Sequence, residues 1–373
     1  MSSICIIRTS SIGDVVLATV TLNLLHSVQF DGEITWVGRE PTGSLLRACF
    51  PSLRVVDIGH GTAALSLNKI AELVGPVDLV VDLQGNLRSK LLAIKLRFSG
   101  AKVSSSPKEY GQRVKMVMKA KRRGRNALLP EELVSPEFRQ TQLMVKALTK
   151  GMSAVWPELD LTSVTPRPNL PPVPNDETPS VMKELNQGEW LAVAPGAAFA
   201  PKRAPTTVFE SILKQFQDRV RSLNEVYPNF MEGGCGLVFL GGKEDQESAS
   251  ELMSAMNWKG PTLNLTGKVD LTKSSQALRY VSGLLTNDSS LGHIAEAVGT
   301  PVGVLFGPTV EGFGFVPWKP ESMAFSNRIG CRPCSKHGKL ECRYQDYKCF
   351  YGIDSGAVVD KMIQWFDLKD GSK

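Results

Sequence analysis

Long hydrophobic runs are missing from this sequence, although 42% of its residues are hydrophobic. No run reaches the roughly 18–20 apolar residues that a helix needs to cross a bilayer. The opening MSSICIIRTSSIGD is also unlike a secretory signal, because its apolar stretch is short and is followed by Arg8 and Asp14. We therefore expect a cytoplasmic protein.

The signature motifs of several large enzyme classes are missing as well. No G-x-G-x-x-G follows a predicted strand and no G-x-x-x-x-G-K-[ST] occurs, which argues against a dinucleotide oxidoreductase and a P-loop NTPase. Without H-E-x-x-H or G-x-S-x-G, zinc proteases and α/β-hydrolases are not indicated. The chain has no Asp-x-Asp pair, which a metal-dependent sugar transferase commonly shows. A diphosphate bound here would be held by helix termini and cations.

Disulfides are not expected, because the seven cysteines form an odd set in a chain predicted to be intracellular. A late cluster joins a C-x-x-C pair to two further cysteines, with His337 as a spare ligand. This spacing suits a structural zinc or iron–sulfur site, and reduced thiols packing a loop are the alternative. We favour the thiols and predict that no metal or cofactor is needed. The cluster consists of Cys331, Cys334, Cys342 and Cys349.

Positive charge exceeds negative charge by only 6, and much of it lies in one stretch. Such a stretch is either a solvated face or a contact with an anionic surface, such as membrane headgroups, a phosphorylated glycolipid or nucleic acid. Aromatic residues are not interleaved with these charges, so a stacking platform for nucleic acid is not expected. The basic residues are Lys115, Lys119, Lys121, Arg122, Arg123 and Arg125.

Two α/β domains are predicted, because 373 residues exceed the usual size of one core. Short β-branched runs alternate with amphipathic helical patterns, which indicates parallel sheets covered on both faces. The segment TPRPNLPPVPNDETPS, residues 165–180, is too rich in proline for a helix or central strand and reads as a linker. The expected strands are 4–8, 33–37, 54–58 and 77–83 in the first half, and 190–194, 236–240, 262–265, 283–286 and 302–306 in the second.

We accordingly divide the chain into a first domain over 1–170, a second over 171–356 and a last helix over 357–373. That helix is expected to pack back on the first domain. In sheets of this kind ligands bind at the carboxyl ends of the strands, and a cleft between two domains is a frequent site.

Polar residues follow three of the predicted strands. Ser10-Ser11-Ile12-Gly13-Asp14 places an aspartate at a helix start, either as a cap or as a general base. Lys202 follows Pro195-Gly196 and is either solvated or positioned to reach a phosphate. Thr286-Asn287-Asp288-Ser289-Ser290-Leu291-Gly292-His293 joins a strand to a helix whose free N–H groups form an anion site. Taken singly, these last residues are ordinary caps and a core histidine.

Four segments together resemble glycosyltransferase family 9, the heptosyltransferases of lipopolysaccharide core assembly. They are IIRTSSIGDVVLATVTLNLL, VDLQGNLRSKLLA, VAPGAAFAPKRAP and LTNDSSLGHIAEAVGTPVGVLFGPT, and they span both halves in order. Three departures are visible: Ser289-Ser290 replaces Thr-Gly, Ala204 stands where an aromatic residue is expected, and a proline is missing near Val20. These bear on the identity of the donor more than on the fold or reaction class.

The resemblance implies a GT-B fold of two facing Rossmann-like domains and an inverting, metal-independent transfer of heptose, or a related sugar, from an ADP-sugar. The acceptor would be an anionic glycolipid at the cytoplasmic face of the inner membrane, with the protein bound there peripherally. Asp14 matches the catalytic base, and Gly13, Arg88, Lys90, Lys121 and Arg122 are expected to meet the acceptor. The donor-binding set is Gly196, Lys202, Glu244, Asp288, Ser289, Ser290 and His293.

Two other functions fit parts of the pattern. A GT-B-like nucleotide-sugar epimerase would turn over without an acceptor and would need a second acid or base. A non-catalytic protein that binds polyanions through the basic stretch would show salt-sensitive binding and release no nucleoside diphosphate. The motifs around Asp14 and Asp288–His293 favour transfer over both.

Overall fold

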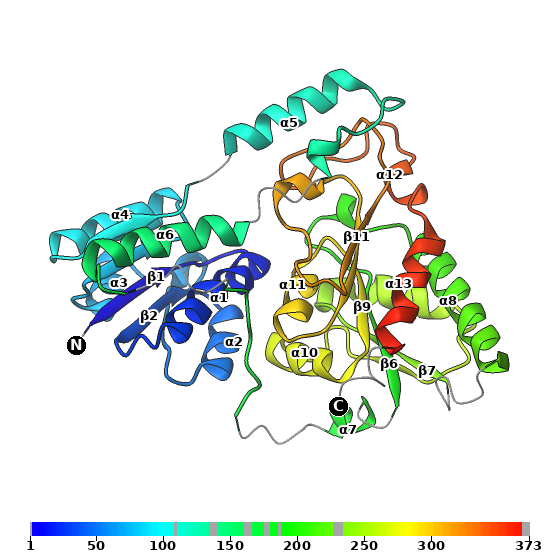
Figure 1. Cartoon of the computed structure of the whole chain (residues 1–373), viewed down its shortest axis with the longest axis horizontal. Helices are drawn as coiled ribbons and strands as arrows, with labels where there is room; N and C mark the ends of the chain where they lie inside the picture. Colours follow the sequence, from blue (N-terminus) through cyan, green and yellow to red (C-terminus); the bar gives the residue numbers. More distant parts are fainter. Residues whose placement is uncertain are drawn as a thin grey trace. The chain divides into compact units, whose positions relative to one another are not determined.

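The computed structural model describes residues 2–107, 110–134, 140–159, 166–174, 180–185, 188–226 and 234–367 (Figure 1). The chain divides into two compact units. Unit 1 comprises Met1–Glu109 and Arg139–Asp176, and unit 2 comprises Tyr110–Phe138 and Glu177–Lys373. Each unit has its own parallel β-sheet, as the sequence predicts. Among the described residues, no helix is both long and apolar enough to span a membrane.

The sheet of unit 1 has the strand order β3-β2-β1-β4-β5, and all its pairings are parallel. Its central strands are apolar runs, because helices shield both faces of a parallel sheet from water. Helices α3 and α4 pack on one face, and α1 packs against α6, which contacts β4 and β5. The strands are β1 (Ser3–Ile7), β2 (Glu33–Gly38), β3 (Arg54–Asp57), β4 (Leu79–Asp82) and β5 (Lys102–Ser105). The helices are α1 (Ile12–Ser27), α2 (Thr42–Cys49), α3 (Leu67–Val74), α4 (Leu87–Phe98) and α6 (Gln140–Val155).

The sheet of unit 2 has the order β11-β10-β9-β6-β7-β8, which is the doubly wound order of a Rossmann fold. Its strands are β6 (Glu189–Ala194), β7 (Cys235–Phe239), β8 (Thr262–Asn264), β9 (Gly283–Asn287), β10 (Val302–Phe306) and β11 (Met323–Ser326). Its helices are α5 (Tyr110–Arg123), α7 (Ser180–Leu185), α8 (Thr206–Val226), α9 (Gln246–Ala255), α10 (Leu271–Ala277), α11 (Ser290–Ala297), α12 (Lys348–Tyr351) and α13 (Ser355–Asp367).

Helix α13 differs from its prediction, because it belongs to the core of unit 2. Its Met362 and Trp365 are buried with Phe209 and Phe216 of α8 in one apolar cluster. Gly283 of β9 leaves room for the Trp365 indole, since a Cβ atom there would come well within 3.0 Å of it. The helix therefore covers the sheet of unit 2, and residues 368–373 of the predicted segment lie outside the described part of the chain.

Segment 110–134 also packs with unit 2, although the sequence assigns it to the first domain. Leu129 and Leu133 form an apolar cluster with Val310 and Phe313. Arg123 of α5 donates hydrogen bonds to the carbonyl oxygens of Gly330 and Arg332, at 3.0 and 2.7 Å. Within the proline-rich segment, the backbone N–H of Asn169 donates to the Thr19 hydroxyl of α1 at 3.1 Å, so this part lies on unit 1. Residues 160–165 and 175–179 lie outside the described part of the chain.

Both sheets have a point at which the chain changes direction across the strand order. In unit 1 this switch point lies between β1 and β4, and in unit 2 it lies between β6 and β9. Open α/β sheets bind ligands outside the carboxyl ends of the strands at such points. The polar loops selected from the sequence follow β1, β6 and β9, so each of them lies at a switch point.

Candidate functional site

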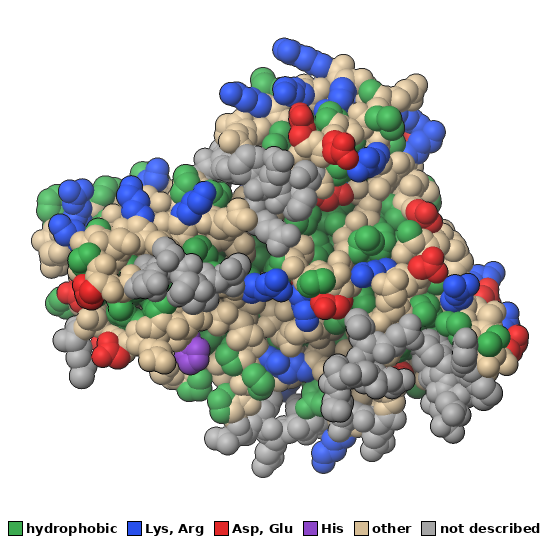
Figure 2. All heavy atoms as spheres, in the orientation of Figure 1, with side chains coloured by type: hydrophobic (Ala, Val, Ile, Leu, Met, Phe, Trp, Pro, Cys, Tyr) green, Lys and Arg blue, Asp and Glu red, His purple; other side chains and the backbone are tan. Residues whose placement is uncertain are grey.

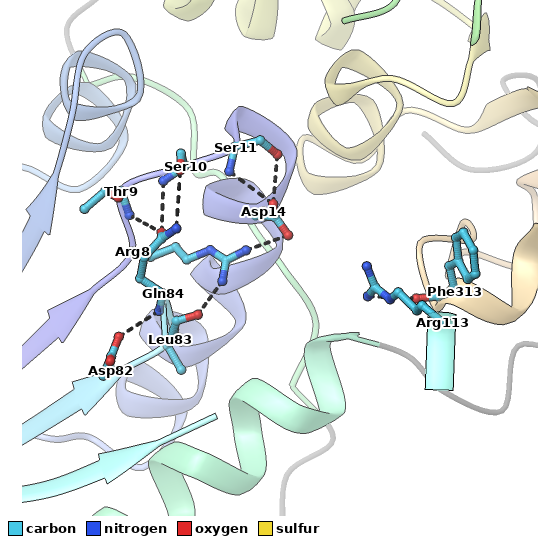
Figure 3. Close-up of polar contacts among 10 residues, drawn as sticks. All are labelled: Arg8, Thr9, Ser10, Ser11, Asp14, Asp82, Leu83, Gln84, Arg113 and Phe313. Atoms are coloured by element: carbon cyan, nitrogen blue, oxygen red, sulfur yellow. Dashed lines mark hydrogen bonds and ion pairs between the residues drawn. The ribbon is translucent and has the colours of Figure 1, made fainter. Parts of the chain in front are cut away.

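Asp14 lies in the first turn of α1, just beyond the end of β1 (Figure 3). One carboxylate oxygen, Oδ2, accepts hydrogen bonds from the backbone N–H and the hydroxyl of Ser11, at 3.1 and 2.9 Å. The other, Oδ1, lies 2.6 Å from Nη2 of Arg8. The Asp14 side chain keeps 21% of its surface exposed. It therefore caps the helix and still presents an oriented, accessible carboxylate.

The loops after β1 and β4 are joined across the switch point of unit 1 (Figure 3). Gln84 Oε1 accepts hydrogen bonds from the backbone N–H groups of Thr9 and Ser10, at 2.9 and 3.2 Å. The guanidinium of Arg8 donates to the carbonyl oxygen of Leu83. Asp82, which is 1% exposed, accepts the Gln84 N–H at 2.9 Å. Gln84 and Asp82 thus hold the loop that carries Asp14, a role that the motif around them did not reveal.

The residues predicted to bind the acceptor are divided between the two units. Gly13 is buried at the start of α1, Arg88 donates to the carbonyl oxygen of Leu65, and Lys90 is exposed on α4. Lys121 and Arg122 are exposed on α5. The first three therefore belong to unit 1 and the last two to unit 2, whereas the sequence placed all five in one domain.

Lys202 and Asp288 form an ion pair at the switch point of unit 2, with Nζ and Oδ2 2.7 Å apart. Lys202 ends the short 3₁₀ turn η3 (Ala200–Lys202) after β6, and Asp288 follows β9 directly. Asp288 Oδ2 also accepts the hydroxyl of Thr309 at 2.7 Å. Burial opposes ionisation of Asp288, but Lys202, Thr309 and the charge of His293 hold its pKa below the ordinary value. Asp288 thus stays ionised, although the side chains of Lys202 and Asp288 are only 15% and 12% exposed.

Asn287 fixes the distance between the loops that carry this ion pair. Its side chain is fully buried, and Nδ2 donates to the carbonyl oxygen of Pro195 at 2.6 Å. Its Oδ1 accepts the backbone N–H of Ala204 at 3.0 Å. One amide side chain thus binds both ends of the loop around Lys202 to the end of β9. The sequence pattern contained Asn287, but nothing in it indicated this role.

Helix α11 begins beside the ion pair, with Ser289 as its N-cap. The Ser289 hydroxyl lies 3.0 Å from that of Thr286, and Ser290 occupies the first helical position. Asp288, Ser289 and His293 line a small cavity of about 10 Å³. The His293 ring is 9% exposed and stacks on Trp318 with ring centres 6.5 Å apart. The structure therefore brings together the predicted residues of this motif at one helix N-terminus, where backbone N–H groups attract anions.

Gly196 is a close-approach position beside a second carboxylate. A Cβ atom at Gly196 would come well within 3.0 Å of the Asp245 carboxyl group, which is 8% exposed. Asp245 accepts the Gly242 N–H at 3.0 Å and pairs with Arg203 at 3.2 Å, although burial raises its pKa. The neighbouring Glu244, which the sequence assigned to the donor, is exposed in the 3₁₀ turn η4 (Lys243–Asp245) that follows β7. Of these two neighbours, Asp245 rather than Glu244 thus packs against the Lys202 loop.

The four late cysteines line one cavity of about 210 Å³, together with Lys121 and Arg125. Burial raises the pKa of Cys331, and it raises that of Cys334 to about 11 and that of Cys349 to about 12. Burial also opposes ionisation of Cys342. Hydrogen bonds with the backbone of Tyr347 and of the residues just before it nevertheless lower the pKa of Cys342. In the part of the chain that is described, no three His, Cys, Asp or Glu side chains are arranged to hold a metal ion.

Residues 69–345 match the family described as Glycosyltransferase family 9 (heptosyltransferase). Over 126 residues the chain is 29% identical to lipopolysaccharide heptosyltransferase 2 of Escherichia coli K12. This alignment covers 33% of this chain and 32% of that protein. Over 128 residues the chain is 27% identical to lipooligosaccharide heptosyltransferase 2 of Haemophilus influenzae. That alignment covers 34% of this chain and 33% of that protein. These alignments span about a third of each curated relative.

Two solved structures resemble the chain over nearly its whole length. A family 9 glycosyl transferase from Veillonella parvula has a TM-score of 0.67 at 18% identity, with 98% of this chain and 97% of that chain covered. The ADP-heptose lipopolysaccharide heptosyltransferase II of Escherichia coli has a TM-score of 0.62 at 16% identity, with 100% of both covered. At such identities the likeness concerns the fold, and it confirms the predicted GT-B class with its Rossmann-like domains.

Proposed function

The chain belongs to glycosyltransferase family 9, and on that premise we propose that it transfers a heptose, or a related sugar, from an ADP-sugar to a lipopolysaccharide core. The names of its curated relatives and of one solved relative support this choice. The observation that carries the proposal is the Lys202–Asp288 pair beside the N-terminus of α11, at the switch point of a Rossmann sheet. The acceptor would be an anionic glycolipid at the cytoplasmic face of the inner membrane.

The donor is assigned to unit 2. Its diphosphate oxygens would accept hydrogen bonds from Lys202 and from the first N–H groups of α11, near Ser289 and Ser290. Negative charge grows on the leaving diphosphate as the sugar departs, so these contacts strengthen in the transition state. Because a lysine and a helix N-terminus supply the positive charge, the proposed reaction needs no metal. Gly196 and Glu244 remain proposed donor contacts on the neighbouring loops, and His293 lies one turn into the helix.

The acceptor is assigned to unit 1, with Asp14 as the general base. The acceptor hydroxyl oxygen bonds to the anomeric carbon as the bond from that carbon to the diphosphate breaks, which inverts the anomeric centre. Asp14 takes the hydroxyl proton as the new bond acidifies it. Its contacts with Arg8 and Ser11 fix the orientation of the carboxylate before substrate arrives. Gly13, Arg88 and Lys90 are the proposed acceptor contacts of this unit.

The direct test combines purified protein, ADP-heptose and a lipopolysaccharide core acceptor, and measures ADP release together with the mass of the product. We expect release that requires the acceptor and persists in EDTA. Lys202→Met is expected to weaken donor binding by about 10–100-fold, the loss of one charge-assisted contact. Lys214→Met, which removes an exposed lysine of α8, is the matched control. A changed sugar nucleotide formed without acceptor would instead identify an epimerase.

A further inference from the structure

Helix α4 has two apolar faces, although only one of them packs on the sheet. Leu92, Ala93 and Leu96 are buried in the core of unit 1. The opposite face is apolar as well, whereas the solvent side of a surface helix is ordinarily polar. It consists of Leu87, Leu91, Ile94 and Phe98, which are 75%, 44%, 49% and 89% exposed.

These four side chains form one narrow stripe, which we call the α4 stripe. Their spacing is four, three and four residues, which corresponds to neighbouring positions on successive helical turns. At about 100° per residue they fall within a sector of about 60° around the helix axis. The stripe therefore runs along the full length of α4 and is continuous.

Basic residues border the α4 stripe on both sides. By the same helical geometry, Lys90 and Arg97 lie along one edge, and Arg88 and Lys95 lie along the other. Helix α4 contains no acidic residue. Figure 2 shows Lys and Arg side chains interspersed with hydrophobic ones over the region that α4 occupies in Figure 1.

The edge strand β5 carries one more exposed apolar side chain. Val103 of β5 is 40% exposed, and its register partner Val80 packs in the same core as Leu92 of α4. Val103 therefore points to the face of the sheet that α4 covers. Lys102 beside it is also exposed.

We propose that the α4 stripe binds the surface of an anionic lipid bilayer. Its apolar side chains would enter the boundary between headgroups and acyl chains, while the exposed flanking cations Lys90, Lys95 and Arg97 contact lipid phosphates. We choose an anionic bilayer as the partner because its charge and polarity complement those of the helix. The apolar stripe matches the acyl chains, and the basic residues on both edges, with no acidic residue on α4, match the negative headgroups. This inference rests on the proposed function, and it places Lys90, a proposed acceptor contact, at the depth of the headgroups.

The first test measures binding to vesicles without any sugar nucleotide, so it does not depend on catalysis. We expect the full-length protein to float with phosphatidylglycerol–phosphatidylethanolamine vesicles and not with phosphatidylcholine vesicles. Phe98→Ser should weaken binding about tenfold, and Ile94→Ser combined with it about a hundredfold, because each removes an apolar side chain that the bilayer would bury. Lys95→Glu with Arg97→Glu should weaken binding at low salt by about tenfold or more. Val226→Ser, at a residue of α8 that is 67% exposed, should leave it unchanged.

Tryptophan emission measures insertion into the bilayer as a second, separate test. Phe98→Trp should add emission that shifts to shorter wavelength when anionic vesicles are present, whereas Val226→Trp should not shift. Circular dichroism of each variant shows whether it folds. Failure of the wild-type chain to bind anionic vesicles would overturn the proposal, and so would equal binding of the Phe98 and Val226 variants.

Two further outcomes separate this inference from the proposed transfer. If Phe98→Ser dissociates a dimer and vesicles have no effect, the α4 stripe joins two copies of the chain and the lipid proposal is wrong. With a deacylated, water-soluble acceptor, the Phe98→Ser/Ile94→Ser variant should transfer sugar at the wild-type rate. With the acceptor embedded in anionic vesicles, it should be at least about tenfold slower. Vesicle binding without transfer would contradict the proposed function alone.

Discussion

The Lys202 ammonium lies 2.7 Å from the Asp288 carboxylate, and the two residues come from loops that follow adjacent strands, β6 and β9. Thr309 donates to the same carboxylate oxygen from the loop after β10. In the free protein, Asp288 thus neutralises the lysine proposed to meet the donor diphosphate and holds it in place. An incoming diphosphate would compete with Asp288 for Lys202.

A double-mutant cycle measures this pairing. Lys202→Met leaves the Asp288 carboxylate shielded from water without its cation, so the Tm should fall by about 2–6 °C. In the Asp288→Asn background, Lys202→Met should lower the Tm clearly less, because no charge is then left unpaired. Calorimetry of the four proteins gives the coupling. Additive shifts would mean that the pair makes no net contribution to folding.

Asp14→Asn tests the base. The amide keeps the size of the side chain but does not take a proton, so transfer should fall at least about 100-fold while donor binding stays unchanged. Steady-state rates and donor titration by thermal shift provide the two readings. Asp31→Asn, at an exposed aspartate, serves as the control. Asp14 has no part in the chemistry if the amide variant transfers sugar at the wild-type rate.

Gly196→Ala tests the close approach of Asp245 to the Lys202 loop. The new methyl group would collide with the Asp245 carboxyl group, so we expect a loss of about 1–3 kcal/mol of stability together with weaker donor binding. Gly111→Ala is the control, because a Cβ atom there meets nothing within 4 Å. Equal stability of the two variants would show that the loop moves to accommodate the methyl group without loss of folding free energy.

Glu296 should make stability depend on pH. Burial raises its pKa from 4.5 to about 7, while the backbone N–H groups of Trp318 and Lys319 oppose that shift. At pH values between about 4.5 and about 7, Glu296 is protonated in the folded chain and ionised in the unfolded chain. Raising the pH through this range therefore lowers the free energy of unfolding, by about 3 kcal/mol at most. The stabilisation is complete below the lower value and is lost as pH rises through about 7.

Glu296→Gln removes this titration and keeps a hydrogen-bond acceptor. The Tm of the wild-type protein should therefore fall relative to that of the variant between about pH 5 and about pH 8. Parallel curves for the two proteins over that range would show that Glu296 ionises as it does in the unfolded chain.

The cysteines around the 210 Å³ cavity should differ in reactivity. Iodoacetamide attacks thiolates, so Cys342, with its lowered pKa, should be alkylated first at about pH 7.5. Cys334 and Cys349 should react last, because burial raises their pKa values to about 11 and about 12. Peptide mapping by mass spectrometry gives the order. Equal protection of all four thiols, with zinc or iron in the purified protein, would instead favour the metal centre that their spacing allows.

Most of the secondary structure could be predicted from local pattern. The predicted strand 302–306 coincides with β10, and 262–265 differs from β8 by one residue, because a buried parallel strand is a short apolar run between turn residues. Helix α5 could not be assigned in this way. Its sequence is rich in basic residues, and the helix is anchored by contacts of Arg113 and Arg123 with loops that are distant in sequence.

The sequence by itself determined the alternation of strands and helices, the polar loops after β1, β6 and β9, and the likeness to one enzyme family. Only the tertiary structure decided which of those loops meet. Lys202 reaches Asp288 because β6 and β9 are neighbours, and Asp245 rather than Glu244 packs against Gly196. Periodicity reports which face of an element avoids water, whereas the order of strands depends on how all the faces pack at once.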